Sequence, residues 1–223
     1  MHAKSAAPGV HAVYEDADLL VLQKPSGLLC VPGRGPDKQD CLSARAQERW
    51  PGALIVHRLD QATSGLVIMA RHIDAQRRLS HAFAERQVHK RYQAVVQGCM
   101  QPHPSDATAW QDIDLPIAAD WERRPLRVID PMLGKSSLTR WRPQRHDAAT
   151  DTTHVELEPV TGRTHQLRVH LAAVGHPILG DALYADAATQ AQAPRLLLHA
   201  SHLRFLHPAT GAELALEWPA NFE

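Results

Sequence analysis

Runs of apolar residues divide most of the chain into short strands with helices between them. Residues 11–24 predict a strand, an acidic turn and a second strand, because AVY and LLVL flank the turn EDAD. ALIVHRLD (53–60) and GLVIMA (65–70) are strand-like and enclose a polar stretch. KRYQAVVQG (90–98) alternates, and THVELEPV (153–160) predicts a further strand. PRLLLHASHLRFLHP and GAELALEWP predict a terminal hairpin with PATG as its turn.

Three segments have helical spacing. DCLSARAQERW (40–50) predicts a short helix with Asp40 as its cap, and DAQRRLSHAFAER (74–86) predicts a longer one. TGRTHQLRVHLAAVGHP (161–177) predicts a turn followed by a helix that ends at Gly175. Residues 99–144 predict irregular structure with short strands. Because the elements lack a regular βαβ rhythm, we expect an α+β fold with a mixed, mainly antiparallel central sheet flanked by helices.

The length of the chain suits one large domain or two small lobes. It has 223 residues, of which 44% are hydrophobic, and no linker or repeat divides it. No apolar run approaches the roughly 18 residues that span a bilayer, and the start MHAKSAAPGV lacks a secretory apolar region. The three cysteines include no C-x-x-C pair, so neither a disulfide framework nor a zinc site is expected. We therefore expect a cytoplasmic protein without a membrane segment.

Charge is unevenly distributed along a chain whose formal net charge is zero. Residues 45–92 contain nine Lys/Arg against four Asp/Glu, and residues 121–145 contain seven against two. This distribution suits a protein that presents a basic face to a polyanion such as nucleic acid. Ordinary arginines on solvated surfaces are the alternative interpretation.

Several kinds of chemistry lack their motif here. The sequence contains no G-x-G-x-x-G, no P-loop and no G-x-S-x-G, which disfavours nucleotide-cofactor, phosphoryl-transfer and serine-hydrolase functions. The fifteen histidines are scattered and form no H-E-x-x-H. We expect no metal; the alternative is a metal-dependent hydrolase, which a chelator would inhibit.

The stretch HRLDQATSG (57–65) places Asp60 between two apolar runs. A carboxylate in such a setting remains ionised only if a cation compensates it. Arg58 and the distant Arg163, at the turn into a predicted helix, are the candidate partners. A desolvated, ionised Asp can act as a nucleophile or a base, but a structural Arg–Asp bridge explains the same residues.

Tyr92 follows two cations in the sequence KRY. An aromatic ring next to positive charge suits stacking on a nucleic-acid base. A tyrosine on a strand face is also common in a core, so the motif by itself supports both interpretations.

Five stretches resemble one known family. HRLDQATSG is similar to the H-R-L-D-x-x-T-S-G signature of the RluA family of RNA pseudouridine synthases. The resemblance extends to VYEDADLLVLQKPSGLLCVPG with its K-P-x-G loop, to KRYQAVVQG, to TGRTHQLRVHLAAVGHPILGDALY with its G-R-T-H-Q-I/L-R and G-D-x-x-Y patterns, and to PRLLLHA. In order and spacing the matches run from His11 to Pro219. The resemblance implies one catalytic domain over residues 11–219 with a central RNA-binding cleft.

The same resemblance implies roles for individual residues. Asp60 would be the catalytic carboxylate, acting at C1′ of the target uridine by nucleophilic attack or by a glycal route. Arg163 would pair with Asp60, and Tyr92 would pack on the flipped uracil and serve as a base. Arg58 would enter the RNA where the base left, and Leu197 or Leu198 would line the pocket. No cofactor is needed, because the isomerisation is redox-neutral.

Further residues of the matched or basic segments are expected to contact RNA. They are His57, Thr63, Lys90, Arg91, Arg123, Arg124, Gln166 and Arg168. DLPIAADWERRP and APRLLLHA resemble the dual-specificity members of the family, which act on 23S rRNA and on the tRNA anticodon stem-loop. We expect a monomer without the N-terminal S4 domain that other members carry. The alternative is a non-catalytic RNA-binding or chaperone protein on the same fold.

Overall fold

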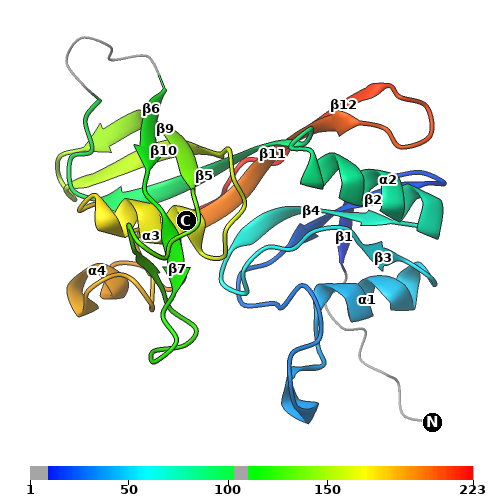
Figure 1. Ribbon diagram of the computed structural model, residues 1–223, viewed down its shortest axis with the longest axis horizontal. Coiled ribbons are helices and arrows are strands. Elements are labelled where there is room, and N and C mark those ends of the chain that lie inside the picture. The colour runs from blue at the N-terminus through cyan, green and yellow to red at the C-terminus, as the bar shows by residue number, and fades with distance from the viewer. Residues whose placement is uncertain (1–9, 103–109, 223) are drawn as a thin grey trace. The chain divides into compact units, whose positions relative to one another are not determined.

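The structure is a computed structural model that describes residues 10–102 and 110–222 (Figure 1). The chain forms two compact units. Unit 1 comprises the residues up to Val88 together with Leu203–Trp218, and unit 2 comprises His89–His202 together with the segment from Pro219. Among the described residues, no helix has the length and apolarity needed to cross a membrane.

The sheet of unit 1 has its two most buried strands at the centre. The strand order is β1–β2–β4–β11, where β3 also pairs with β4 and β12 with β11. The strands are β1 (His11–Glu15), β2 (Leu19–Lys24), β3 (Leu54–Ile55), β4 (Ser64–Ala70), β11 (Leu198–Leu206) and β12 (Glu213–Glu217). Strand β11 is divided between the units, with residues 198–202 in unit 2 and the rest in unit 1. Strands β2 and β4 are antiparallel, with Leu22 opposite Val67. Both strands are buried along almost their whole length, because helices cover the two faces.

Two α-helices and a short 3-10 helix complete unit 1. They are η1 (Pro36–Lys38), α1 (Leu42–Arg49) and α2 (Ile73–Ala84). In the view of Figure 1, α2 lies above the strands and α1 below them. Leu79 of α2 packs into an apolar cluster with Ile68 of β4 and Phe205 of β11. Burial of each of these side chains stabilises the fold by about 1.5–3 kcal/mol. This burial holds β4 in place and, with it, the polar loop that precedes β4.

Unit 2 is built on the strand order β11–β5–β10–β9–β6, with a separate two-stranded hairpin. Its strands are β5 (His89–Gln97), β6 (Gln111–Asp114), β9 (Leu138–Asp147) and β10 (Thr152–Pro159), and the hairpin consists of β7 (Ile117–Ala119) and β8 (Arg127–Ile129). Helix α3 (Gln166–Ala173) packs against β8, β9 and β10, and α4 (Ala187–Ala191) follows it. The predicted α+β class is confirmed.

Local differences from the sequence prediction have identifiable causes. Residues 57–60 are not a strand, because the amide of Ile68 in β4 donates to the Nε2 atom of His57 (2.9 Å) and not to a neighbouring backbone carbonyl. Asp40 does not cap α1, since its carboxylate binds the guanidinium of Arg45 and Cys41 holds the cap position. The predicted irregular region, residues 99–144, includes the first seven residues of the long strand β9. The predicted central cleft and the single domain over 11–219 stay predictions.

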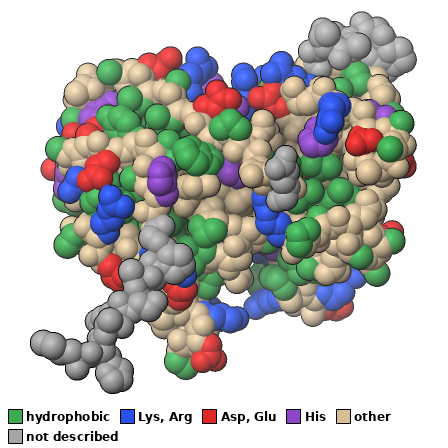
Figure 2. All heavy atoms as spheres, turned by 180° about the vertical axis from the view of Figure 1, so that it is seen from behind, with side chains coloured by type: hydrophobic (Ala, Val, Ile, Leu, Met, Phe, Trp, Pro, Cys, Tyr) green, Lys and Arg blue, Asp and Glu red, His purple; other side chains and the backbone are tan. Residues whose placement is uncertain are grey.

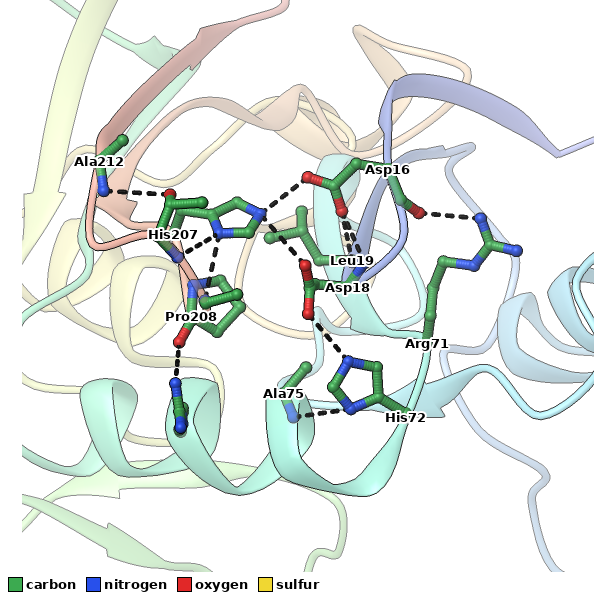
Figure 3. Close-up of polar contacts among 12 residues, drawn as sticks. Asp16, Asp18, Leu19, Arg71, His72, Ala75, His207, Pro208 and Ala212 are labelled. Carbon is green, nitrogen blue, oxygen red and sulfur yellow. Dashed lines mark hydrogen bonds and ion pairs between the residues drawn. The ribbon is translucent and has the colours of Figure 1, made fainter.

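A polar network joins three turns of unit 1 (Figure 3). Asp16 lies in the β1–β2 turn, where its carboxylate accepts from the hydroxyl of Tyr14 (2.6 Å), the amides of Asp18 and Leu19, and His207 Nε2 (2.7 Å). His207 lies at the β11–β12 turn and is 6% exposed. Asp18 in turn contacts His72, whose ring accepts from the amide of Ala75 and caps α2. The network therefore ties both hairpin turns to the start of α2.

Neutralising Asp16 should destabilise unit 1 in a pH-dependent way. Burial alone raises the pKa of Asp16, but the hydrogen bonds from Tyr14, the two amides and His207 outweigh burial and lower the pKa to about 2. A depressed carboxyl pKa contributes stability that is complete above about pH 4 and is lost as the pH falls toward 2. Asp16→Asn should therefore cost about 2 kcal/mol at pH 7, and less as the pH approaches 2.5.

Urea unfolding of wild type and variant at both pH values measures this difference. Asp112→Asn is the matched control, since the Asp112 carboxylate is 58% exposed and lies 3.8 Å from Arg140. We expect the control to change stability by less than about 0.5 kcal/mol at either pH. An equal loss at pH 7 and pH 2.5 for Asp16→Asn would show that the charge is not the source of the stability.

Candidate active site

The loop that carries Asp60 lies between β3 and β4 in unit 1. Leu59 is 7% exposed and anchors the loop, whereas the neighbouring Arg58 is exposed and Asp60 is half-buried. The amide of Thr63 donates to the carbonyl of Asp60 (3.2 Å), which closes the turn before β4. The alternation of exposed, buried and half-buried side chains therefore leaves Arg58 in solvent and Asp60 at the edge of the core.

Lys24, at the end of β2, is hydrogen-bonded to this loop. Its side chain is fully buried, and its ammonium donates to three carbonyls, those of Pro25 (2.9 Å), Leu28 (2.7 Å) and Gln61 (3.0 Å). The ammonium has three donors, so all of them are satisfied. Two of the acceptors lie within or directly after the K-P-x-G loop, and the third follows Asp60 directly. Lys24 thus fastens the two loops together at the position of the candidate carboxylate.

Three ionisable groups lie close together at this loop: Lys24, Cys30 and Asp60. Burial lowers the pKa of Lys24 to about 8, and the charges of Cys30 and Asp60 partly oppose that shift. Burial also raises the pKa of the Cys30 thiol, whose sulfur accepts from the amide of Leu59 (3.2 Å). At neutral pH Lys24 therefore remains a cation close to Asp60, and it is a source of positive charge that the sequence pattern did not indicate.

Two other residues of this loop that were predicted to contact RNA, His57 and Thr63, are packed against the protein. The ring of His57 stacks on Phe83 of α2 at 4.3 Å between centroids, and its Nε2 atom accepts from the amide of Ile68. Thr63 is 2% exposed. These environments favour a role in shaping the loop over direct contact with RNA, because the Nε2 atom of His57 is already occupied and Thr63 is shielded from solvent.

In unit 2, Tyr92 lies on β5 opposite Leu157 of β10 and is half-buried. Arg163 lies in the loop before α3 and is exposed. Its guanidinium donates to the carbonyl of Ser136 through Nε (3.3 Å) and Nη2 (3.2 Å). Asp60 belongs to unit 1 and both of these residues to unit 2, so the predicted pairing of Asp60 with Arg163 stays a prediction.

Gln166 was expected to contact RNA, but in the structure it holds the Arg163 loop in position. Its side chain is 3% exposed. Its Oε1 atom accepts from Thr161 Oγ1 (2.7 Å) and from the amide of Arg163 (3.0 Å), while Nε2 donates to the Leu138 carbonyl and to Thr139 Oγ1 (both 3.0 Å). All its hydrogen-bonding capacity is used inside the protein. The G-R-T-H-Q pattern therefore includes a residue that shapes the loop.

Arg168 also differs from the predicted contact with RNA. It is 4% exposed and forms a bidentate ion pair with Asp181, which is 1% exposed, at 2.8 and 2.6 Å. The same carboxylate accepts from the amides of Leu183 and Tyr184. The sequence prediction missed this pair. The signal that could have found it is Asp181 of the G-D-x-x-Y pattern, since a buried arginine needs a buried carboxylate as its partner.

Tyr184 connects that pair to the Arg163 loop. Its hydroxyl accepts from the amide of Arg127 (3.0 Å) and lies 2.6 Å from Nδ1 of His165, which has a left-handed φ of 57°. The hydroxyl thus joins the β7–β8 hairpin to the residue that precedes α3.

The remaining predicted contacts fall into three environments. Arg91 is paired with Glu156 (3.5 Å) and Glu158 (3.7 Å), so its charge is neutralised on the sheet face. Burial lowers the pKa of Lys90. Arg123 and Arg124 are exposed at the β7–β8 turn, whereas Leu197 and Leu198 are buried in unit 2. The predicted place of these two leucines in the lining of a pocket stays a prediction.

Asp16, Asp18 and His207 are spaced closely enough to suggest a metal site, with ligand atoms within 4.8 Å of one another. The hydrogen bonds favour a different arrangement. The Nδ1 atom of His207 accepts from the amides of Ala209 and Thr210 (both 3.2 Å), so the ring proton lies on Nε2 and points at Asp16. A metal bound to Nε2 would have to replace the proton on that atom. The proton could not move to Nδ1, because Nδ1 already accepts from two amides. The cluster is better explained as the structural network of Figure 3.

One face of the surface shows how the charges are distributed. In Figure 2, Lys and Arg side chains on this face are interspersed with Asp and Glu side chains. Part of the basic segment 121–145 is balanced by nearby acidic groups, since Arg140 and Arg142 both contact glutamates on the sheet. The predicted basic face stays a prediction.

Comparison with known proteins assigns the family. A family model described as RNA pseudouridylate synthase matches residues 18–173, a range that contains both the Asp60 loop and the Arg163 loop. The chain belongs to the RNA pseudouridylate synthase family. It is 45% identical to "Dual-specificity RNA pseudouridine synthase RluA" of Escherichia coli (strain K12), over 96% of this chain and 95% of that protein. The corresponding protein of Haemophilus influenzae is 40% identical over the same shares.

Solved structures agree with this RNA pseudouridylate synthase assignment. "Human RNA Pseudouridylate Synthase Domain Containing 1" superposes with a TM-score of 0.79 and 31% identity, covering 99% of this chain and 86% of that one. "Human RNA Pseudouridylate Synthase Domain Containing 4" gives 0.70 and 25%, covering 94% and 88%. The RluA-type family predicted from the five motifs is therefore confirmed. The protein is an isomerase by family, and the family acts on RNA.

Proposed function

We propose that this RNA pseudouridylate synthase isomerises uridines in 23S rRNA and in a tRNA anticodon stem-loop. The similarity over 96% of the chain to proteins named dual-specificity RluA carries this proposal. We further propose that it acts in the cytoplasm as a monomer, through one catalytic domain over residues 11–219 and without a cofactor or metal.

The site residues take their proposed roles from the matched motifs and their local structure. Asp60 is the carboxylate that acts at C1′ of the target uridine, and its loop is held by the Lys24 hydrogen bonds. Arg163 compensates its charge, and the Gln166 hydrogen bonds hold the loop of Arg163. Tyr92 packs on the extruded uracil and moves a proton, with Leu197 or Leu198 against the base. Arg58, exposed beside Asp60, enters the RNA at the vacated position.

The proposed reaction conserves atoms and electrons. The bond between C1′ and N1 breaks, the uracil turns in the pocket, and a bond forms between C1′ and C5. C5 loses its proton and N1 gains one, so no oxidant or reductant is needed. The target uridine must leave its stack to be reached, and a dry pocket prevents water from diverting the reaction to base loss.

Release of the C5 hydrogen gives a direct test. Unmodified 23S rRNA fragments and tRNA transcripts labelled with tritium at uridine C5 should lose tritium to water when incubated with the protein. A chelator should leave the rate unchanged. Mapping pseudouridine in each product, and in cellular RNA with and without the protein, identifies the modified positions.

A non-catalytic RNA-binding protein is the competing function. It would bind both RNAs with a strong salt dependence but would release no tritium. Tritium release from rRNA alone or from tRNA alone would support the isomerase and contradict the dual specificity.

A further inference from the structure

Trp121 lies exposed at the tip of the β7–β8 hairpin in unit 2. Its side chain is 71% exposed, whereas Trp50 and Trp141 are 4% and 7% exposed in the core. Figure 1 shows β7 leading down to this tip. Isolated exposed apolar residues are common on protein surfaces, so exposure by itself identifies no site.

The second observation is the position of Arg124. Its guanidinium carbon lies 4.1 Å from the centroid of the Trp121 ring. An arginine covers one face of the indole, so most of the exposed area belongs to the opposite face and the edges. An indole with an arginine over one face and the other face open can stack on a nucleic-acid base.

Trp110 shows what an arginine–tryptophan contact looks like when it is purely structural. Arg91, Arg140 and Arg142 lie within 5.6 Å of its ring. Each of these guanidiniums also pairs with a carboxylate of the sheet, as the Arg142–Glu156 contact illustrates. In the described part of the chain, no carboxylate lies within ion-pair distance of Arg124. Its positive charge is therefore available to a phosphate.

The backbone around Trp121 is held in place. Asp120 accepts from the amide of Arg123 (3.0 Å) and from its Nε atom (2.7 Å), and its own amide donates to the carbonyl of Leu126 (3.1 Å). The side chain of Arg123 is thus turned toward Asp120, which leaves Arg124 on the ring. A preorganised tip loses little entropy when a ligand binds.

Hydrogen bonds connect β8 and the segment after it to the loop before α3, one of them through Tyr184. The amide of Arg127 binds Tyr184, which binds His165, and the carbonyl of Ser136 accepts from Arg163. The tip is therefore fixed relative to Arg163 within unit 2. A nucleotide held at the tip would have a set position relative to the residue proposed to compensate Asp60.

We propose that Trp121 and Arg124 form a stacking platform for one unpaired nucleotide of the substrate RNA, distinct from the uridine that is isomerised. The open face of the indole stacks on the base, and Arg124 contacts a neighbouring phosphate. The platform selects RNAs in which a single-stranded loop reaches the hairpin tip. This inference rests on the proposed function and names a further determinant of its specificity.

The test compares two RNA probes: a short unmodified stem–loop with a uridine-rich loop, and the same stem closed as a duplex without unpaired bases. Trp121→Ala should weaken binding of the stem–loop by about tenfold and leave the duplex within about twofold. Trp121→Phe keeps an aromatic face and should retain most of the affinity. Met132→Ala, at a residue 89% exposed, is the control for loss of an exposed apolar side chain and should change neither affinity.

Quenching of tryptophan fluorescence gives an independent measurement. The stem–loop should quench the wild type and the Met132→Ala variant, and the Trp121→Phe variant should lose most of that quenching. The platform is wrong if Trp121→Ala binds the stem–loop like the wild type, if it loses both probes equally, or if the wild type binds neither probe. Wild-type binding without tritium release from rRNA or tRNA would instead contradict the proposed function and leave the platform standing.

Discussion

Asp60→Asn should abolish pseudouridine formation, with a loss of at least about a thousandfold in rate, while the protein remains folded and binds RNA. The amide has almost the same shape as the carboxylate but can neither attack C1′ nor remove a proton there. The loop itself should persist, because Lys24 binds the carbonyls of Pro25, Leu28 and Gln61 and does not depend on the Asp60 side chain. Tritium release under single-turnover conditions measures the rate.

The matched control is Asp74→Asn, at an exposed aspartate in the first turn of α2. It should retain the wild-type rate. Urea unfolding and stem–loop binding of Asp60→Asn distinguish loss of chemistry from loss of structure. A variant that releases tritium at the wild-type rate would remove Asp60 from the mechanism.

Arg168→Met should destabilise the fold strongly, by about 3–5 kcal/mol. It leaves the carboxylate of Asp181, which is 1% exposed, without its guanidinium partner. Because Asp181 also holds the amides of Leu183 and Tyr184, the loss extends to the hydroxyl that joins His165 to Arg127. Urea denaturation at pH 7 gives the free energy of unfolding.

Two further variants test the cause. Arg204→Met removes an arginine whose side chain is 53% exposed and 3.9 Å from Glu213, so it should cost less than about 0.5 kcal/mol. Arg168→Met combined with Asp181→Asn should recover at least about 1 kcal/mol relative to Arg168→Met alone, since no unpaired charge remains buried. If the double variant is no more stable than the single one, lost packing and not the buried charge is responsible.

Sequence patterns determined the elements whose apolar spacing is strong. Strands β2 and β4 follow from LLVL and GLVIMA, and α2 from the spacing of DAQRRLSHAFAER, because burial of these side chains dominates the local energetics. The family also followed from the sequence alone, because five stretches resemble the motifs of that family in order and spacing. The same resemblance implies that Asp60, Tyr92 and Arg163 are site residues.

Other features depended on partners far away in the chain. The sequence placed Gln166 and Arg168 among the RNA contacts because they stand in a motif beside Arg163. In the tertiary structure both are bonded inside the protein, to Leu138 and Asp181, because α3 is buried at every position from Gln166 to Leu171. A helical pattern shows which residues share a face but does not show whether a polar residue on that face finds a buried partner.

Lys24 and Trp121 also show that the sequence does not reveal burial, since the charged residue is buried and the aromatic residue is exposed. The sequence does not show the surroundings of Lys24, whose fully buried ammonium donates to three carbonyls that only the folded loops bring together. A tryptophan in an irregular stretch gave no sign of its surroundings, and it is exposed with Arg124 on its ring. The sequence alone determined the family and the candidate reacting residues, because these depend on residue type. Which polar groups support the site and which remain open to solvent was decided by tertiary contacts, because burial is a property of the folded chain.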